Sequence, residues 1–109
     1  TLNNLAVLQS AQNQLRDAEA SYREALQISR DLAAENPKAY LPDVATTLIN
    51  LSIFYLQAQP DRDQSIALAL EVLDIAQGFQ EIPRVMNDAA KAVQVLQAHN
   101  WEGLPPPEE

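Results

Sequence analysis

Apolar residues recur along the chain at alternating intervals of three and four, the spacing that places side chains on one face of an α-helix. One segment shows this spacing clearly in Ala18, Tyr22, Ala25, Ser29 and Leu32. We therefore expect that stripe to face another helix. The pattern as a whole predicts an all-α fold with five helices, at about 1–14, 16–35, 42–58, 63–78 and 83–99.

The third predicted helix lacks charged residues from Val44 to Pro60, whereas its neighbours carry several each. A helix without a charged face is usually enclosed on several sides. We therefore expect this helix at the centre of a stack, with the first two helices on one side and the last two on the other.

Prolines mark the predicted helix ends. Pro37 should end the second helix, while Pro42 and Pro83 suit the first turn of a helix, where a missing N–H costs nothing. If the third helix begins at Pro42, Asp43 lies at the positive end of its dipole. The sequence thus predicts a loop around Pro37 and a new helix from Pro42.

Asp61 and Asp63 precede the fourth helix and are candidate N-cap carboxylates, and Gly78 is placed to close that helix. The same two acids resemble the start of a calcium loop. The central glycine of such a loop is missing, however, and Val72 stands where its bidentate glutamate should be. Helix capping is therefore the interpretation we adopt.

Two parts of the chain are copies of each other. Residues 1–8 (TLNNLAVL) match residues 47–54 (TLINLSIF) at an offset of 46, and residues 24–29 match residues 71–76 at an offset of 47. A half-length copy follows from Val85 to Leu96. Helix pairs that repeat in this way bury their apolar faces by stacking on the next pair, so the repeat predicts an α-solenoid.

The repeat divides the chain into a helical domain, residues 1–99, and a Pro-rich acidic tail, residues 100–109. Within the domain we expect a first repeat at about 1–35, a second at about 42–78, and a half-repeat or capping helix at about 83–99.

These copies resemble the tetratricopeptide repeat, and in particular its longer variety found in kinesin light chains. The resemblance lies in residues 1–6 (TLNNLA), 18–26 (AEASYREAL) and 42–48 (PDVATTL). It implies that Leu5 and Ala6 are the apolar and small pair of an inner helix. It likewise implies small, aromatic and small positions on an outer helix, which are Ala18, Tyr22 and Ala25.

The resemblance implies a protein-binding module within a larger scaffold or adaptor protein, whose inner helices line a concave groove that binds a peptide or a helix. The groove-facing positions it implies are Asn3, Asn4 and Val7 on the first helix, Ile49, Asn50 and Ile53 on the third, and Ala90, Lys91 and Gln94 on the fifth.

A row formed by Asn4, Asn50 and Lys91 is the centre of this predicted groove. An amide side chain offers both a donor and an acceptor, so asparagines can hold a peptide backbone, while Val7 and Ile53 take an apolar residue. The alternative is that the asparagines form hydrogen bonds within the repeat.

Charge narrows the range of partners. Seven basic and fifteen acidic residues give a formal net charge of −8, which repels nucleic acid and anionic lipid surfaces. The uncharged stretch in the third helix is more polar and shorter than the roughly 20 apolar residues of a membrane span. We therefore expect a protein or peptide partner, with neither nucleic acid nor a membrane.

The chain has few residues that could act in catalysis or bind a metal or a cofactor. The chain has no cysteine, one histidine and no glycine-rich phosphate loop, so we expect no cofactor, no metal site and no enzymatic activity. The sequence begins inside a helical pattern without a signal peptide. This favours a segment of a longer protein, and a cytoplasmic rather than a secreted one.

Two alternatives to groove binding stay open. The stacking face of the first helix, Leu2, Leu5 and Leu8, can be covered by a second copy, giving a homodimer through the exposed N-terminal helix pair. Alternatively, the chain is a structural end segment of a longer repeat array with no ligand of its own.

Overall fold

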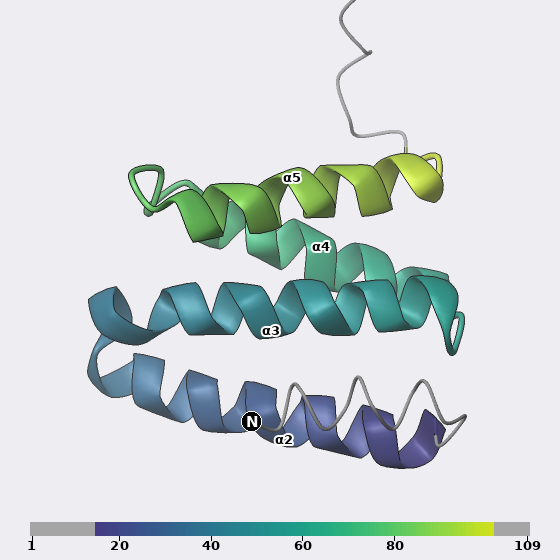
Figure 1. Ribbon diagram of the computed structural model, residues 1–109, viewed down its shortest axis with the longest axis horizontal. Coiled ribbons are helices and arrows are strands. Elements are labelled where there is room, and N and C mark those ends of the chain that lie inside the picture. The colour runs from purple at the N-terminus through teal and green to yellow at the C-terminus, as the bar shows by residue number, and fades with distance from the viewer. Residues whose placement is uncertain (1–14, 102–109) are drawn as a thin grey trace, which may run out of the picture.

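The computed structural model describes residues 15–101, which form four α-helices (Figure 1). These are α2 (Leu15–Glu35), α3 (Pro37–Gln57), α4 (Arg62–Ala76) and α5 (Pro83–Ala98). They correspond to the last four of the five predicted helices, and the described part of the chain contains no strand. The predicted helix at 1–14 lies outside the described residues, as does most of the predicted tail.

Helix α3 begins earlier than the sequence predicted. Its first residue is Pro37 rather than Pro42, and Asn36 is the N-cap, whose side chain accepts a hydrogen bond from the Ala39 N–H at 3.4 Å. Both Pro37 and Pro42 suit the first turn of a helix. The helix begins at Pro37 because Asn36 before it provides a capping side chain. Pro42 is buried inside the helix, where it removes one backbone hydrogen bond. Asp43 therefore lies within α3 and not at its N-terminus.

Helix α4 is capped as predicted at its start but not at its end. Asp61 accepts hydrogen bonds from the backbone N–H of Gln64 at 3.2 Å and from its side chain at 3.1 Å. Asp61 thus satisfies one of the free N–H groups of the first turn, and the Gln64 side chain donates a second hydrogen bond to the same carboxylate. The helix ends at Ala76 with Gln77 as C-cap, so Gly78 lies just beyond it and does not adopt a positive φ.

Helix α5 begins at Pro83, as predicted, and ends in a left-handed turn. Asn100 has a φ of 54°, a conformation that asparagine tolerates better than most residues. The Trp101 N–H bonds to the Leu96 carbonyl at 3.0 Å and the Asn100 N–H to the Gln97 carbonyl at 3.0 Å. These two bonds satisfy the last carbonyls of the helix and hold Trp101 against the core.

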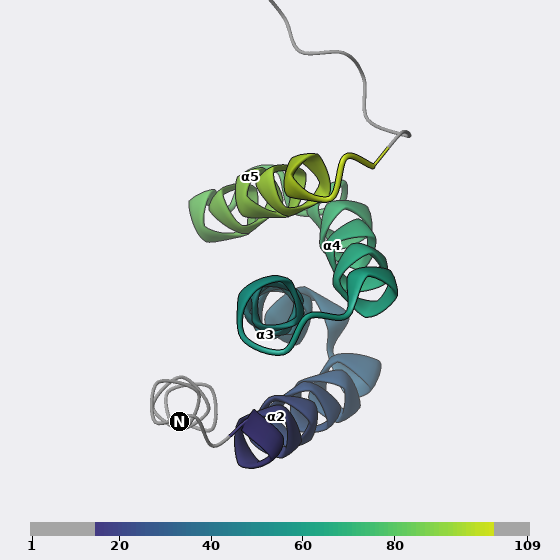
Figure 2. The ribbon, with the colours of Figure 1, turned by 90° about the vertical axis from the view of Figure 1, so that its right-hand side faces the viewer.

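Helix α3 lies at the centre of the stack. Figure 2, which looks nearly along α3, shows α2 below it, α4 beside it and α5 above it. All three neighbours contact α3. The prediction that the uncharged helix is central is confirmed for the described residues, because α3 buries side chains on nearly every side.

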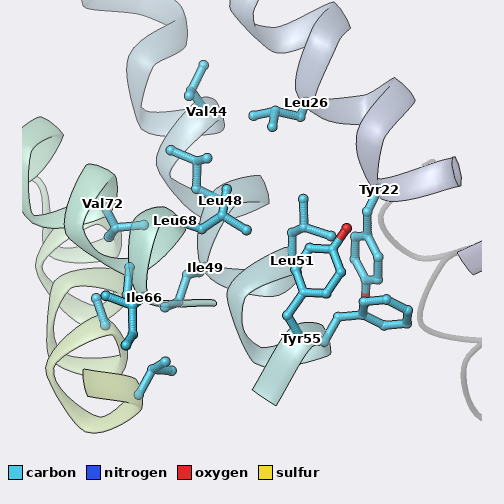
Figure 3. Packing of buried hydrophobic residues seen from close by; sticks show 14 of the residues in the cluster. Tyr22, Leu26, Val44, Leu48, Ile49, Leu51, Tyr55, Ile66, Leu68 and Val72 are labelled. Carbon is cyan, nitrogen blue, oxygen red and sulfur yellow. The ribbon is translucent and has the colours of Figure 1, made fainter. Parts of the chain in front are cut away.

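The core follows the predicted stripes with one correction. Ala18, Tyr22 and Ala25 are buried on α2, but Leu32 is 40% exposed, and Leu26 and Ala33 are buried instead. Figure 3 shows the central part of this core, in which side chains of α2, α3 and α4 meet. The Phe54 ring packs between two tyrosines, 5.5 Å from Tyr22 and 5.4 Å from Tyr55 between ring centroids.

A polar network joins three helices around Tyr55. Its buried hydroxyl donates a hydrogen bond to Glu19 on α2 and accepts one from Arg23 at 2.9 Å. The Arg23 guanidinium also contacts Gln64 on α4. Burial raises the pKa of the Tyr55 phenol above its ordinary value. The hydroxyl therefore stays protonated and keeps its donor role.

A pair of serines fastens α3 to α4. The Ser52 hydroxyl donates to the Ser65 carbonyl at 2.7 Å, and the Ser65 hydroxyl donates to the Ser52 carbonyl at 2.8 Å. Both side chains are fully buried, so each hydroxyl needs its partner. His99 Nε2 lies 2.9 Å from the Ser65 hydroxyl oxygen, which links the end of α5 to the same pair.

Replacing these serines tests the contact. Ser65→Ala should lower the free energy of unfolding by about 1–3 kcal/mol, because a buried hydrogen bond is lost and His99 loses its partner. Ser52→Ala should cost less, since it leaves the histidine contact in place. Urea unfolding followed by circular dichroism measures both. Equal losses would contradict the role given to His99.

The cap of α4 predicts that the stability of the protein falls at acid pH. Hydrogen bonds from the side chain and the backbone of Gln64 lower the pKa of Asp61 below the ordinary carboxyl value of 3.8. The ionised Asp61 cap stabilises the fold fully at pH values above 3.8, the pKa of an unfolded chain. This stabilisation is lost as the pH falls through the lower pKa of Asp61 in the folded protein. Asp61→Asn keeps a capping side chain, so it should flatten the fall in urea midpoint below about pH 4.

Asp63→Asn is the matched control, because Asp63 lies in the same first turn without capping it. An unchanged acid profile in Asp61→Asn would overturn this prediction.

Candidate functional site

Two polar contacts mark the line along which α3 meets α5. Arg84 Nη1 pairs with Asp43 Oδ1 at 2.9 Å, and the Thr46 hydroxyl donates to Asp88 Oδ2 at 2.8 Å. The paired residues are 41 and 42 positions apart in the sequence. Because the separation stays nearly constant, α3 and α5 run parallel with a fixed register. We call this line and the side chains beside it the α3–α5 seam.

The predicted groove residues continue the seam. Asn50 lies four residues after Thr46 on α3, and Lys91 lies three residues after Asp88 on α5, so their separation of 41 residues equals that of Asp43 and Arg84. Ile53 and Gln94 follow in that register. Asn50 and Ile53 are half-buried, and Lys91 and Gln94 are exposed. That they share one face stays a prediction.

Ile49 is a correction to the predicted site. Its side chain is 0% exposed and belongs to the core, as Figure 3 shows, so it has no surface to offer a ligand. The family pattern misplaced it because α3 is covered by three helices and buries side chains on nearly every side. Ala90, also implied by the resemblance, is exposed on α5. Asn3, Asn4 and Val7 lie outside the described residues and stay predictions.

Asp88 is the residue of this face that sequence reasoning missed. It is 5% exposed, and a buried carboxylate is stable only when it is hydrogen-bonded. Thr46 supplies that bond at the edge of the face. The sequence does contain an acid–base pair and an acid–hydroxyl pair separated by 41 and 42 residues. These pairs indicate contacts between α3 and α5 only when the register of the two helices is known.

The Ser65–His99 contact has the distance of a nucleophile and its base, but its position argues against catalysis. The serine hydroxyl is fully buried and already donates to the Ser52 carbonyl, so a substrate cannot reach it. The described residues contain no group of three or more potential metal ligands. Asp61 is a helix cap, which agrees with the interpretation adopted over the calcium loop.

A hollow of about 270 Å³ lies away from the seam, where α2 turns into α3. It is lined by Arg30, Ala33, Ala34, Pro37, Leu41 and Val44. Its lining is mostly apolar, and the Arg30 guanidinium at its edge is already paired with Glu71. None of the predicted groove residues lines it.

The chain was compared with known proteins and families. Residues 1–36 match the family model of the tetratricopeptide repeat. This match supports a tetratricopeptide-repeat protein, and the packed helix pairs of the structure fit that assignment. Such repeats are generally protein–protein interaction modules without enzymatic activity. Comparison with curated proteins and with solved structures gave no significant match.

None of the helices in the described part of the chain combines the length and the apolar character that a membrane crossing requires.

Removing the hydroxyl that holds Asp88 tests the geometry of the seam. Thr46→Val should lower the free energy of unfolding by about 1–3 kcal/mol, because a buried carboxylate loses its donor. Thr46→Ser keeps a hydroxyl at the same position and should cost clearly less. Thermal and urea unfolding compare the two variants. Equal effects would mean that the hydrogen bond does not support Asp88.

Proposed function

We propose that this tetratricopeptide-repeat segment is a protein-binding module whose α3–α5 face holds an extended peptide of a partner protein. The observation that supports the proposal is that Asn50 and Lys91 follow the two polar pairs of the seam on α3 and α5. Hydrogen-bonded pairs precede them along the seam, while no ion pair within residues 15–101 involves Lys91. Peptide-binding surfaces combine side chains that are fixed by hydrogen bonds within the protein with side chains that stay available for hydrogen bonds to the peptide.

Each side chain has a role in this proposal. Asn50 donates to a peptide carbonyl and accepts from a peptide N–H, which requires no particular peptide sequence. Lys91 contributes a positive charge that favours a carbonyl or carboxylate beside it. Ile53 is half-buried and packs against the core, so it offers a fixed apolar contact to one side chain of the peptide. Gln94 extends the polar row by one turn.

The finer assignments are part of the same proposal. Asn3, Asn4 and Val7 would prolong the row on the first inner helix. The kinesin-light-chain-like character is supported by the copy spacing of 46 and 47 residues, which is longer than the roughly 34 residues of the ordinary repeat. A role as scaffold or adaptor would follow if further repeats accompany this segment.

Peptides that bind this face can be isolated from a random display library panned on the full chain. Asn50→Ala with Lys91→Ala should weaken their binding by about tenfold or more, as expected when hydrogen bonds to a ligand backbone and one charge are lost. Fluorescence anisotropy of a labelled selected peptide measures the affinity. The helical circular dichroism signal of the variant should match that of the parent.

Gln27→Ala with Lys38→Ala is the matched control, because it also removes one amide and one ammonium group, both exposed and away from the seam. Its affinity should be unchanged. Light scattering of every variant shows whether the mass changes, which separates peptide binding from self-association through Leu2, Leu5 and Leu8. Equal loss in both double variants, or no loss in the first, would sink the proposal.

A further inference from the structure

The hollow at the junction of α2 and α3 is a surface feature separate from the α3–α5 seam. Ala33 and Val44 in its lining are buried and form its floor, while Ala34 and Pro37 are exposed at its rim. Leu41, which is half-buried, completes the apolar lining. The hollow is thus apolar inside and open to solvent at its rim.

The sequence beside the hollow has a copy at the next helix junction. Residues 41–44 (LPDV) match residues 82–85 (IPRV) at an offset of 41. The ion pair between Asp43 and Arg84 shows that the two copies lie side by side in this register. The valine that ends each copy is buried, and both junctions lie at the same end of the stack, at the left of Figure 1. The second junction therefore shows which side chain fits over this motif.

An aromatic side chain of the chain itself packs over the motif at the second junction. The connection between α4 and α5, residues 77–82, contributes Phe79, which packs against a buried cluster that includes Val85. At the first junction only Asn36 separates the two helices. At the offset of 41 residues the position of Phe79 is taken by Lys38, which is exposed. The hollow thus corresponds to a place that an aromatic ring occupies at the next junction.

The Arg30 guanidinium at the edge of the hollow favours an aromatic ring over an aliphatic side chain. Two hydrogen bonds fix it to Glu71, from Nη1 to Oε2 at 2.6 Å and from Nη2 to Oε1 at 2.8 Å. A planar guanidinium stacks on the face of an aromatic ring, an attraction that a saturated side chain of the same size lacks. An apolar cavity of about 150 Å³ holds a benzene ring. The hollow, at about 270 Å³, therefore has room for one.

We propose that the hollow binds one aromatic side chain of a partner protein, with the ring over Ala33 and Val44 and beside the Arg30 guanidinium. Because the rim is open, the hollow covers only part of a free aromatic molecule, whereas tight ligand sites enclose most of their ligand. A side chain of a partner is held there by the partner's other contacts as well. The inference is independent of peptide binding at the α3–α5 seam, because none of the seam residues lines the hollow.

Disulfide exchange at the rim tests the chemistry of the hollow. The chain has no cysteine, so Ala34→Cys places a single thiol beside it. The full chain is equilibrated with the disulfides of phenylethanethiol, cyclohexylethanethiol and mercaptoethanol, and intact mass spectrometry measures the three adducts. The phenylethyl adduct should exceed the hydroxyethyl adduct by about tenfold or more, because the ring leaves water for an apolar surface.

Ala20→Cys is the matched control, since Ala20 is exposed on α2 and does not line the hollow. The three adducts should form there in nearly equal amounts. A similar distribution at residue 34 would overturn the proposed site.

The comparison of the two ring adducts tests the role of Arg30. At residue 34 the ratio of phenylethyl to cyclohexylethyl adduct should exceed the ratio at residue 20 by about 2- to 5-fold, the range of an exposed cation–π contact. Adding Arg30→Gln to the Ala34→Cys chain should remove this preference and leave the excess over the hydroxyethyl adduct. Equal ratios at residues 34 and 20 would overturn the assignment of an aromatic occupant.

Displayed peptides distinguish a partner's side chain from a free aromatic molecule. A random library panned on the chain with Asn50→Ala and Lys91→Ala, which lacks the proposed seam contacts, should yield peptides that share an aromatic residue. Adding Ala34→Trp, which fills the hollow, should weaken their binding by about tenfold or more, whereas Ala20→Trp should leave it unchanged. Equal affinity for both tryptophan variants would refute the proposal. Binding of free phenylethanol as tight as that of the peptides would refute the assignment to a partner protein.

Discussion

Helix α3 carries no charged side chain from Val44 to its last residue, Gln57, and the rest of the fold depends on covering it. Leaving an apolar helix in water forfeits about 25 cal/mol for each Å² of apolar surface that could be buried. One neighbouring helix covers only a stripe, so α3 needs three, and α2, α4 and α5 all contact it. The shared central helix couples its neighbours, because loss of any one exposes part of the same side chains.

Polar side chains in this arrangement are confined to the edges between helices, where they set register. The serine pair fixes α3 against α4, Tyr55 and Arg23 connect α2, α3 and α4, and Thr46 with Asp88 fixes α3 against α5. Apolar packing alone allows small slides between helices, whereas a buried donor without its acceptor costs about 1–3 kcal/mol. The proposed binding face with Asn50 and Lys91 depends on the register that these edge contacts set.

The sequence predicted the helices and the central place of α3 because periodicity and the absence of charge are local properties that can be counted along the chain. It misplaced the start of α3, since Pro37 and Pro42 both suit a first turn and only the Asn36 cap decides between them. The family pattern placed Ile49 in the groove, but its burial depends on how the three neighbouring helices pack around α3. Contacts such as Arg84 with Asp43 span 41 residues, so they follow from tertiary register and not from local pattern.

The family match ends at residue 36, although the helix pairs continue beyond it. The two interfaces differ in the size of the side chains that face each other. Tyr22 packs against Phe54 in the first interface. The equivalent of Tyr22 on α4 is Ala69, and the register of 41 residues sets Val95 of α5 in the place of Phe54. Both sides of the second interface therefore carry a smaller side chain than in the first, so packing is kept while the residue types differ. Ala69 is 0% exposed and Val95 is 3% exposed, which shows that the smaller pair is as well covered as the aromatic one. The same helix packing is thus compatible with different pairs of facing residues, so a pattern of residue types captures only part of the fold.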